Sequence, residues 1–103
     1  MEKHVNVIRS IINKLKSSVS KESLKQLNLN KCERVVEKLH SFSTDCAECQ
    51  QNLIEFENHF MQLEANVDDI EKDMKRHKKV INELVSHLQK KHKLVPEGFY
   101  LSL

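Results

Sequence analysis

The chain has 103 residues, enough for one small domain, and a net charge of +2. It has one Gly, one Pro and no Trp, and 31% of its residues are charged. Sheets and catalytic loops need turn residues, so this composition argues against them and predicts helices joined by short polar breaks. The eight Lys or Arg residues in 72–93 are interleaved with no aromatic side chain, which argues against nucleic-acid binding.

Apolar residues at helical spacing predict a first amphipathic helix over residues 3–18. Ser17, Ser18 and Ser20 end it, and residues 24–29 form a short helix or a loop. Asn30, with Glu33 three residues later, resembles a capping box and predicts that a second helix covers residues 31–42.

Ser and Thr side chains in residues 41–45 compete for backbone hydrogen bonds and predict a turn. Thr44 or Asp45 is expected to cap the following helix. From that point an apolar stripe continues in alternating steps of three and four residues for about six heptads, which is typical of coiled-coil packing. Its central part, predicted to be an interaction stripe, consists of Leu53, Phe56, Phe60, Leu63, Val67, Ile70, Met74, His77, Ile81, Leu84 and Leu88.

The stripe predicts either one long helix or two helices, at residues 45–65 and 67–93, that fold back near Asn66. Residues 45–71 contain eight acidic residues and no Lys or Arg, whereas residues 72–93 contain eight basic residues and two acidic ones. Antiparallel pairing brings these opposite charges together. A hairpin within one chain and an antiparallel dimer satisfy this pattern equally well.

A C-x-x-C motif at Cys46 and Cys49 begins this segment. It is typical of half a zinc site or of a redox pair, although cysteines also serve as small apolar core residues. If residues 31–42 pair with the next helix, His40 can join Cys46 and Cys49 around one metal ion. Cys32 would then lie about 12 Å from His40 along the helix axis, too far to join them. The stretch from His40 to Leu53 loosely resembles the zinc-binding anti-sigma factors, although their His lies four residues before the first Cys and His40 lies six before.

Among the other histidines, His77 occupies a stripe position. It either makes the pairing sensitive to pH, because burying a charged imidazole is costly, or lies near an edge of the core. His59, His87 and His92 are expected to be solvated. No residues match a catalytic triad, a P-loop or a dinucleotide fingerprint, so the sequence predicts that the chain is not an enzyme.

The tail over residues 94–103 becomes apolar after a basic cluster at Lys90, Lys91 and Lys93, as cytoplasmic domains do where they approach a membrane. About five apolar residues cannot span a bilayer. Residues 86–103, with the Asp-Cys-x-Glu-Cys-Gln stretch at 45–50, are similar to the juxtamembrane part of small Bacillus-type membrane proteins of unassigned function. That resemblance implies a membrane-tethered location and no particular activity.

The sequence therefore predicts a single all-α domain over residues 1–103, an antiparallel helical bundle or hairpin with a long coiled-coil-like C-terminal helix. We expect a cytoplasmic protein–protein interaction module that self-associates as an antiparallel dimer and contacts a membrane through the tail. We expect no cofactor other than zinc. The alternatives are a metal- or redox-responsive regulator that uses the C-x-x-C motif, and a small antagonist or immunity protein that blocks a partner.

Overall fold

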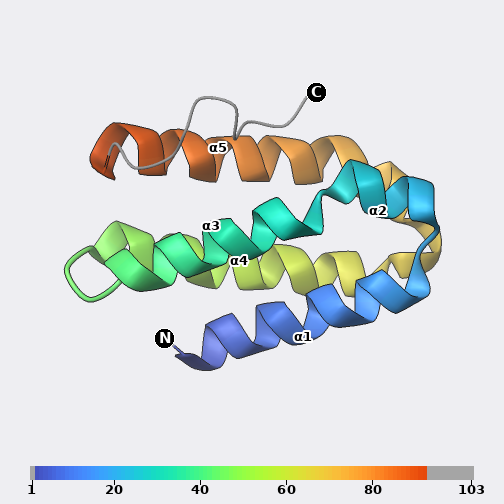
Figure 1. Ribbon diagram of the computed structural model, residues 1–103, viewed down its shortest axis with the longest axis horizontal. Helices are drawn as coiled ribbons and strands as arrows, with labels where there is room; N and C mark the ends of the chain where they lie inside the picture. Colours follow the sequence, from blue (N-terminus) through green and yellow to red (C-terminus); the bar gives the residue numbers. More distant parts are fainter. Residues whose placement is uncertain (1, 93–103) are drawn as a thin grey trace.

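Four long helices alternate in direction along the molecule (Figure 1). The computed structural model describes residues 2–92. The long helices are α1 (Glu2–Ser18), α3 (Leu29–Phe42), α4 (Ala47–Ala65) and α5 (Met74–His92). A short helix α2 (Lys21–Leu27) joins α1 to α3, and a 3-10 segment η1 (Val67–Asp73) joins α4 to α5. No strand occurs in residues 2–92, which confirms the all-α prediction.

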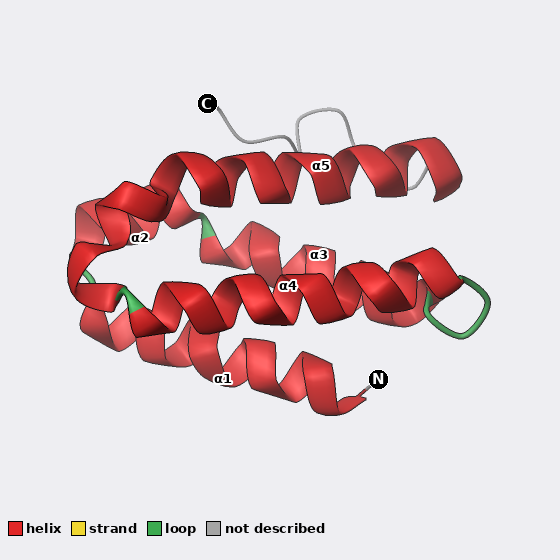
Figure 2. Ribbon diagram, turned by 180° about the vertical axis from the view of Figure 1, so that it is seen from behind, coloured by secondary structure: helices red, strands yellow, loops and turns green. Residues whose placement is uncertain are grey.

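The helices form a bundle in which α3 and α4 lie in the middle, while α1 and α5 lie on opposite sides of that pair (Figures 1 and 2). Helices α1 and α4 run in the same direction, and α5 runs antiparallel to α4. Each helix turns an apolar face inward because its aliphatic residues recur at helical spacing. On α1 this face includes Val5, Ile8, Ile12 and Leu15, each no more than 2% exposed.

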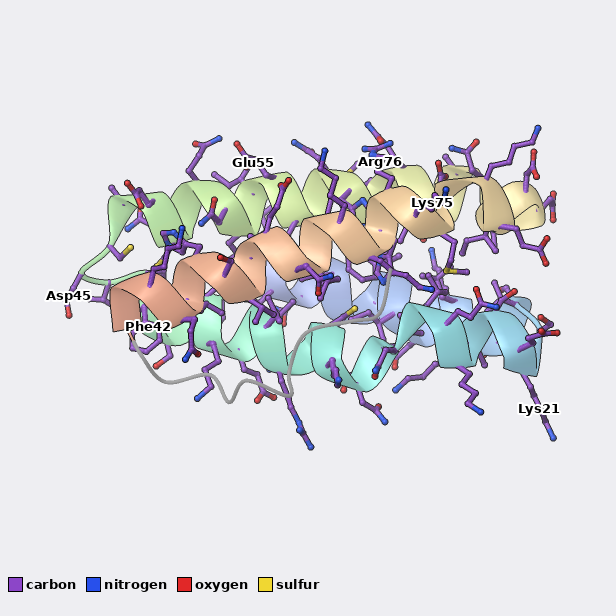
Figure 3. All side chains as sticks on the ribbon, turned by 90° about the horizontal axis from the view of Figure 1, so that it is seen from above. Lys21, Phe42, Asp45, Glu55, Lys75 and Arg76 are labelled. Carbon is purple, nitrogen blue, oxygen red and sulfur yellow. The ribbon has the colours of Figure 1, made fainter. Side chains whose placement is uncertain are left out.

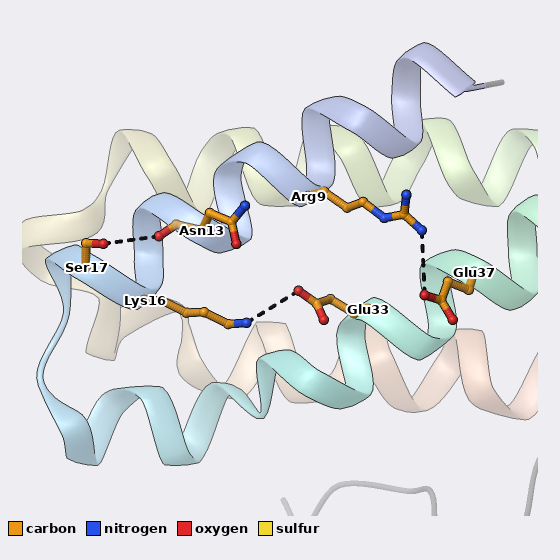
Figure 4. Close-up of polar contacts among 6 residues, drawn as sticks. All are labelled: Arg9, Asn13, Lys16, Ser17, Glu33 and Glu37. Carbon is orange, nitrogen blue, oxygen red and sulfur yellow. Dashed lines mark hydrogen bonds and ion pairs between the residues drawn. The ribbon is translucent and has the colours of Figure 1, made fainter.

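Two ion pairs connect α1 to α3 at the surface (Figure 4). Arg9 Nη2 lies 3.6 Å from Glu37 Oε1, and Lys16 Nζ lies 3.4 Å from Glu33 Oε1. Both pairs are partly exposed, so each stabilises the fold by at most about 1 kcal/mol. The apolar faces beneath them therefore hold α1 in place.

The junction between α2 and α3 differs from the predicted capping box at Asn30. Ser20 caps α2, with its side chain accepting a hydrogen bond from the backbone N–H of Ser23. Asn28 then adopts a left-handed conformation (φ 49°, ψ 59°), and α3 starts directly at Leu29. Asn is one of the few residues that tolerates this conformation, and it is commonly found where helices end. The predicted start at Lys31 is two residues late for this reason.

Replacing Asn28 tests this backbone geometry. Asn28→Val is expected to lower the free energy of unfolding by about 1–2 kcal/mol, because a β-branched side chain is strained at positive φ. Asn28→Gly is expected to be neutral or slightly stabilising. Urea unfolding followed by circular dichroism measures both. Equal stability of the two variants would contradict the strain argument.

Helix α4 ends at Ala65, and the chain reverses through η1, where Asp69 has non-helical angles (φ −132°, ψ 36°). Of the two predicted alternatives, the single long coiled-coil-like helix is therefore not formed, and two helices fold back on each other within one chain. The predicted interaction stripe lies inside the bundle: ten of its residues are at most 8% exposed, and Val67 is half-buried. The stripe thus forms part of the core of the single chain.

None of the helices in residues 2–92 has the length and hydropathy needed to cross a bilayer. The apolar tail that motivates the membrane prediction, residues 94–103, lies outside the described residues.

Candidate metal centre

The loop after α3 places the C-x-x-C motif at the start of α4. Ser43 donates a hydrogen bond to the carbonyl of His40 at 2.7 Å, and the side chain of Gln50 donates to the carbonyl of Ser43. Cys46 is extended (φ −136°, ψ 105°) and is the N-cap of α4. The predicted caps, Thr44 and Asp45, instead lie in the turn that precedes it; Asp45 marks this loop in Figure 3.

The Cys46 side chain acts as a helix cap. Its Sγ accepts a hydrogen bond from the backbone N–H of Cys49 at 3.1 Å. The N–H groups at a helix N-terminus stabilise negative charge, which is the charge that a metal-bound thiolate carries. One turn along the helix, Cys49 turns its own side chain toward the interior and is fully buried. The two sulfur atoms therefore face the same region between α4 and α5.

His87 of α5 completes a group of three metal-ligating side chains. Its Nε2 lies 3.8 Å from Cys49 Sγ, and one ligand atom from each of Cys46, Cys49 and His87 lies within 4.8 Å of the others. The second ring nitrogen, Nδ1, lies 3.6 Å from Glu48 Oε2. Metal-binding histidines commonly donate a hydrogen bond from their second nitrogen to a carboxylate, and Glu48 lies just beyond hydrogen-bond distance in the position that such a carboxylate takes.

These three side chains fit zinc better than other common metals. Thiolate and imidazole ligands favour zinc over calcium or magnesium, which prefer oxygen. Tetrahedral zinc with ordinary bond lengths separates its ligand atoms by about 3.5–3.8 Å. The observed separations need only a small contraction to reach this geometry. Three protein ligands leave a fourth position for water or another ligand.

The electrostatics of Cys49 couple metal binding to proton release. Burial, together with the hydrogen bond and charge of Cys46, raises the pKa of Cys49 to about 12. The thiol is therefore protonated at neutral pH when no metal is bound. Because zinc binds the thiolate, its binding releases this proton and weakens as the pH falls.

The structure brings together two of the three predicted ligands. His40 does not belong to the group that surrounds Cys46 and Cys49, and its Nδ1 is buried with no hydrogen-bond partner among the described residues. Cys32 lies elsewhere in the core, 3.6 Å from His77 Nε2. Burial strongly raises the pKa of Cys32 and keeps it a thiol.

Sequence reasoning missed His87, which it assigned to the solvated surface. The sequence did contain an indication of this contact. Cys49 and His87 are separated from Asp68 by the same number of residues, so a hairpin centred on Asp68 places them opposite each other.

His59 and His77 are likewise separated from Asp68 by equal numbers of residues. His59 is only 4% exposed and His77 is fully buried, so neither the solvated position expected for His59 nor the edge position considered for His77 is correct.

His59 and His77 form a hydrogen-bonded chain across the bundle. His59 Nε2 lies 2.9 Å from His77 Nδ1, and His77 Nε2 lies 2.8 Å from the carbonyl oxygen of Leu27 at the end of α2. A carbonyl can only accept, so His77 Nε2 carries the proton and His77 Nδ1 is an acceptor. His59 must then donate from Nε2. Its Nδ1 is left as an unprotonated acceptor, buried and without a partner among residues 2–92.

Burial keeps both rings neutral. Desolvation lowers the pKa of His59 to about 3, with smaller contributions from repulsion by His77, when that ring is protonated, and by Arg76. Desolvation also lowers the pKa of His77 to about 4, although the hydrogen bond to Leu27 opposes this and Lys78 adds to it. The two rings stack with centroids 5.1 Å apart. The core therefore contains a neutral polar chain that links α4, α5 and α2.

Comparison of the chain with protein-family models, with curated proteins and with solved structures gives no match. A functional conclusion must therefore rest on the residues themselves.

Proposed function

We propose that this chain is a non-enzymatic zinc-binding helical module, in which zinc joins the start of α4 to the C-terminal half of α5. The observation that carries the proposal is the convergence of Cys46, Cys49 and His87 within 4.8 Å. The C-x-x-C motif alone is equally compatible with a redox pair. The third ligand and the carboxylate of Glu48 behind it favour a metal.

Zinc would act as a clasp between two helices. Cys46 and Cys49 lie at the end of α4 opposite η1, and His87 lies in the half of α5 farther from η1. The two helices are already joined by η1 at their other end. A metal ion would close the hairpin at its open end, so that zinc supply controls how firmly α5 is held. This is the basis for a metal-responsive regulator.

Metal analysis of protein purified without chelator tests the proposal. We expect one zinc ion per chain, and a Co²⁺-substituted sample with the absorption bands of a tetrahedral thiolate site. Cys46→Ser, Cys49→Ser and His87→Ala are each expected to weaken zinc binding by about 100-fold or more. Glu48→Gln should weaken it less, since this carboxylate only orients His87.

The matched control is His40→Ala, since His40 is the ligand that the sequence predicts and the structure leaves out of the group. This variant should keep full zinc affinity, and circular dichroism confirms that each variant is folded. If His40→Ala lost zinc while His87→Ala retained it, the third ligand would be His40 rather than His87. Absence of zinc and Co²⁺ binding in a folded wild-type chain would refute the metal proposal altogether.

A second proposed role is binding to a protein partner. Because the predicted interaction stripe is used in the core, a partner or a second copy of the chain would contact an outer face. One such face is a groove of about 650 Å³ between α1 and α4, where Val7 and Ile11 lie beside Met61. Met61 is 49% exposed, the one large apolar residue so exposed among those described. We propose a cytoplasmic setting, with tethering at a membrane through the tail, as part of this role.

A further inference from the structure

A pocket of about 310 Å³ lies along the seam between α4 and α5. Phe56 of α4 and Val80 and Leu84 of α5 supply its apolar lining. Glu55 of α4 and Arg76 of α5, labelled in Figure 3, belong to its polar lining. This volume is at the lower end of the range of small-molecule sites. Most of the other lining residues are polar, so a small molecule with both an apolar part and a polar group would fit.

His59 gives this pocket a specific polar feature. It contributes to the lining although it is only 4% exposed. Its Nε2 donates a hydrogen bond to His77 Nδ1, and the hydrogen bond from His77 to the carbonyl of Leu27 fixes the tautomer of both rings. Its Nδ1 is therefore an acceptor that cannot become a donor without acquiring a charge. No described residue donates to it.

We propose that this pocket binds a small neutral ligand that has an apolar ring and one hydrogen-bond donor, and that His59 Nδ1 accepts that donor. A neutral donor suits the site because the buried ring is itself neutral and a buried charge would be costly. The ring of Phe56 lies parallel to that of His59, with an interplanar angle of 9° and centroids 6.2 Å apart, and is itself fully buried. The ligand's ring would lie against Val80 and Leu84, which line the pocket together with the buried Phe56. His87, a proposed zinc ligand, also lines this pocket, so binding is tested both without and with zinc.

Indole and N-methylindole are the probes that test it, because N-methylation removes the N–H donor and otherwise adds only one methyl group. Binding is measured by ¹⁵N-resolved NMR titration near pH 7.5, first on the metal-free chain and then with one equivalent of zinc. Indole is expected to bind at least about fivefold more tightly than N-methylindole, the difference that one net hydrogen bond makes. The ¹⁵N signal of His59 Nδ1 should shift with indole and stay in place with N-methylindole.

Two variants make the result specific. His59→Phe should remove the preference for indole while keeping weak binding of both probes. Val80→Phe leaves the hydrogen-bonded chain intact and fills the pocket, so it should abolish binding of both; it serves alone if His59→Phe does not fold. Equal affinities of the two probes, an unmoved His59 Nδ1 signal, or unchanged binding in Val80→Phe would overturn the proposal. Because the metal-free chain is measured first, the affinities of the two probes can be interpreted even if the zinc proposal fails.

Discussion

Lowering the pH from about 7 to about 4.5 is expected to reduce the free energy of unfolding by about 5 kcal/mol, through His59 and His77 alone. In the unfolded chain both residues take up a proton as the pH falls through 6.5, their ordinary value. In the folded chain they stay neutral until the pH approaches about 4 for His77 and about 3 for His59. Between these limits the unfolded state binds more protons than the folded state.

The direction of the effect follows from this difference. The neutral histidine pair contributes its full stability above pH 6.5, and that contribution is lost as the pH falls from 6.5 toward about 4. Each histidine removes about 1.4 kcal/mol per pH unit over this interval. A small domain is stable by about 5–15 kcal/mol, so the bundle is expected to unfold, or come close to it, near pH 4.5.

Urea unfolding at a series of pH values, followed by circular dichroism, measures this dependence. The double variant His59→Gln with His77→Gln keeps amide donors and acceptors in place of the rings, and should show a much flatter dependence between pH 6.5 and 4.5. His4→Gln is the matched control, because the His4–Glu57 pair is partly exposed at the surface. If the double variant loses stability with acid as steeply as the wild type, the buried pair is not the cause.

Phe60→Ala is expected to destabilise the bundle by about 3–5 kcal/mol. Phe60 is fully buried and meets Phe56 edge to face, with ring centroids 5.0 Å apart. It also meets the His77 ring at 6.0 Å in the same manner. Removing it therefore leaves a cavity beside the polar chain as well as losing apolar contact. That loss is a large part of the total stability of a domain of this size.

Thermal and urea unfolding at neutral pH measure this effect. Phe60→Leu keeps most of the volume and is expected to cost about 1.5 kcal/mol or less. Met61→Ala, at the next position along α4, is the exposed control and should change stability by less than about 0.5 kcal/mol. A Phe60→Ala variant as stable as Met61→Ala would show that this aromatic cluster is not central to the core.

The helices were predictable because their apolar residues recur at helical spacing. This spacing is a property of the sequence and does not depend on how the helices pack against each other. The first helix was placed within one residue of its observed start, at Glu2. The cap at Cys46 was missed because cysteine is an uncommon N-cap, and the preceding Thr44 and Asp45 are common ones. The start of α3 was missed because it depends on a single left-handed residue, Asn28, rather than on a side-chain cap.

The candidate site was only half predictable. Cys46 and Cys49 are adjacent on one helix, so their spacing alone brings them together. His87 reaches them only through the register of the α4–α5 hairpin, and the stripe was compatible with a dimer as well as with a hairpin. Once the fold-back is known, the equal sequence separations of Cys49 and His87 from Asp68 show that these two residues face each other. His40 is closer in sequence, and that proximity misdirected the sequence-based interpretation.

The 3-10 segment η1, Val67–Asp73, has a consequence for how this chain can vary in length. Both facing pairs across the seam, Cys49 with His87 and His59 with His77, depend on the number of residues between α4 and α5. Inserting one residue in η1 would rotate α5 by about 100° about its own axis. That rotation would carry both histidines away from their partners at once. The metal ligands and the buried imidazole chain therefore share one length constraint, and insertions or deletions in this segment should be tolerated far less than point substitutions.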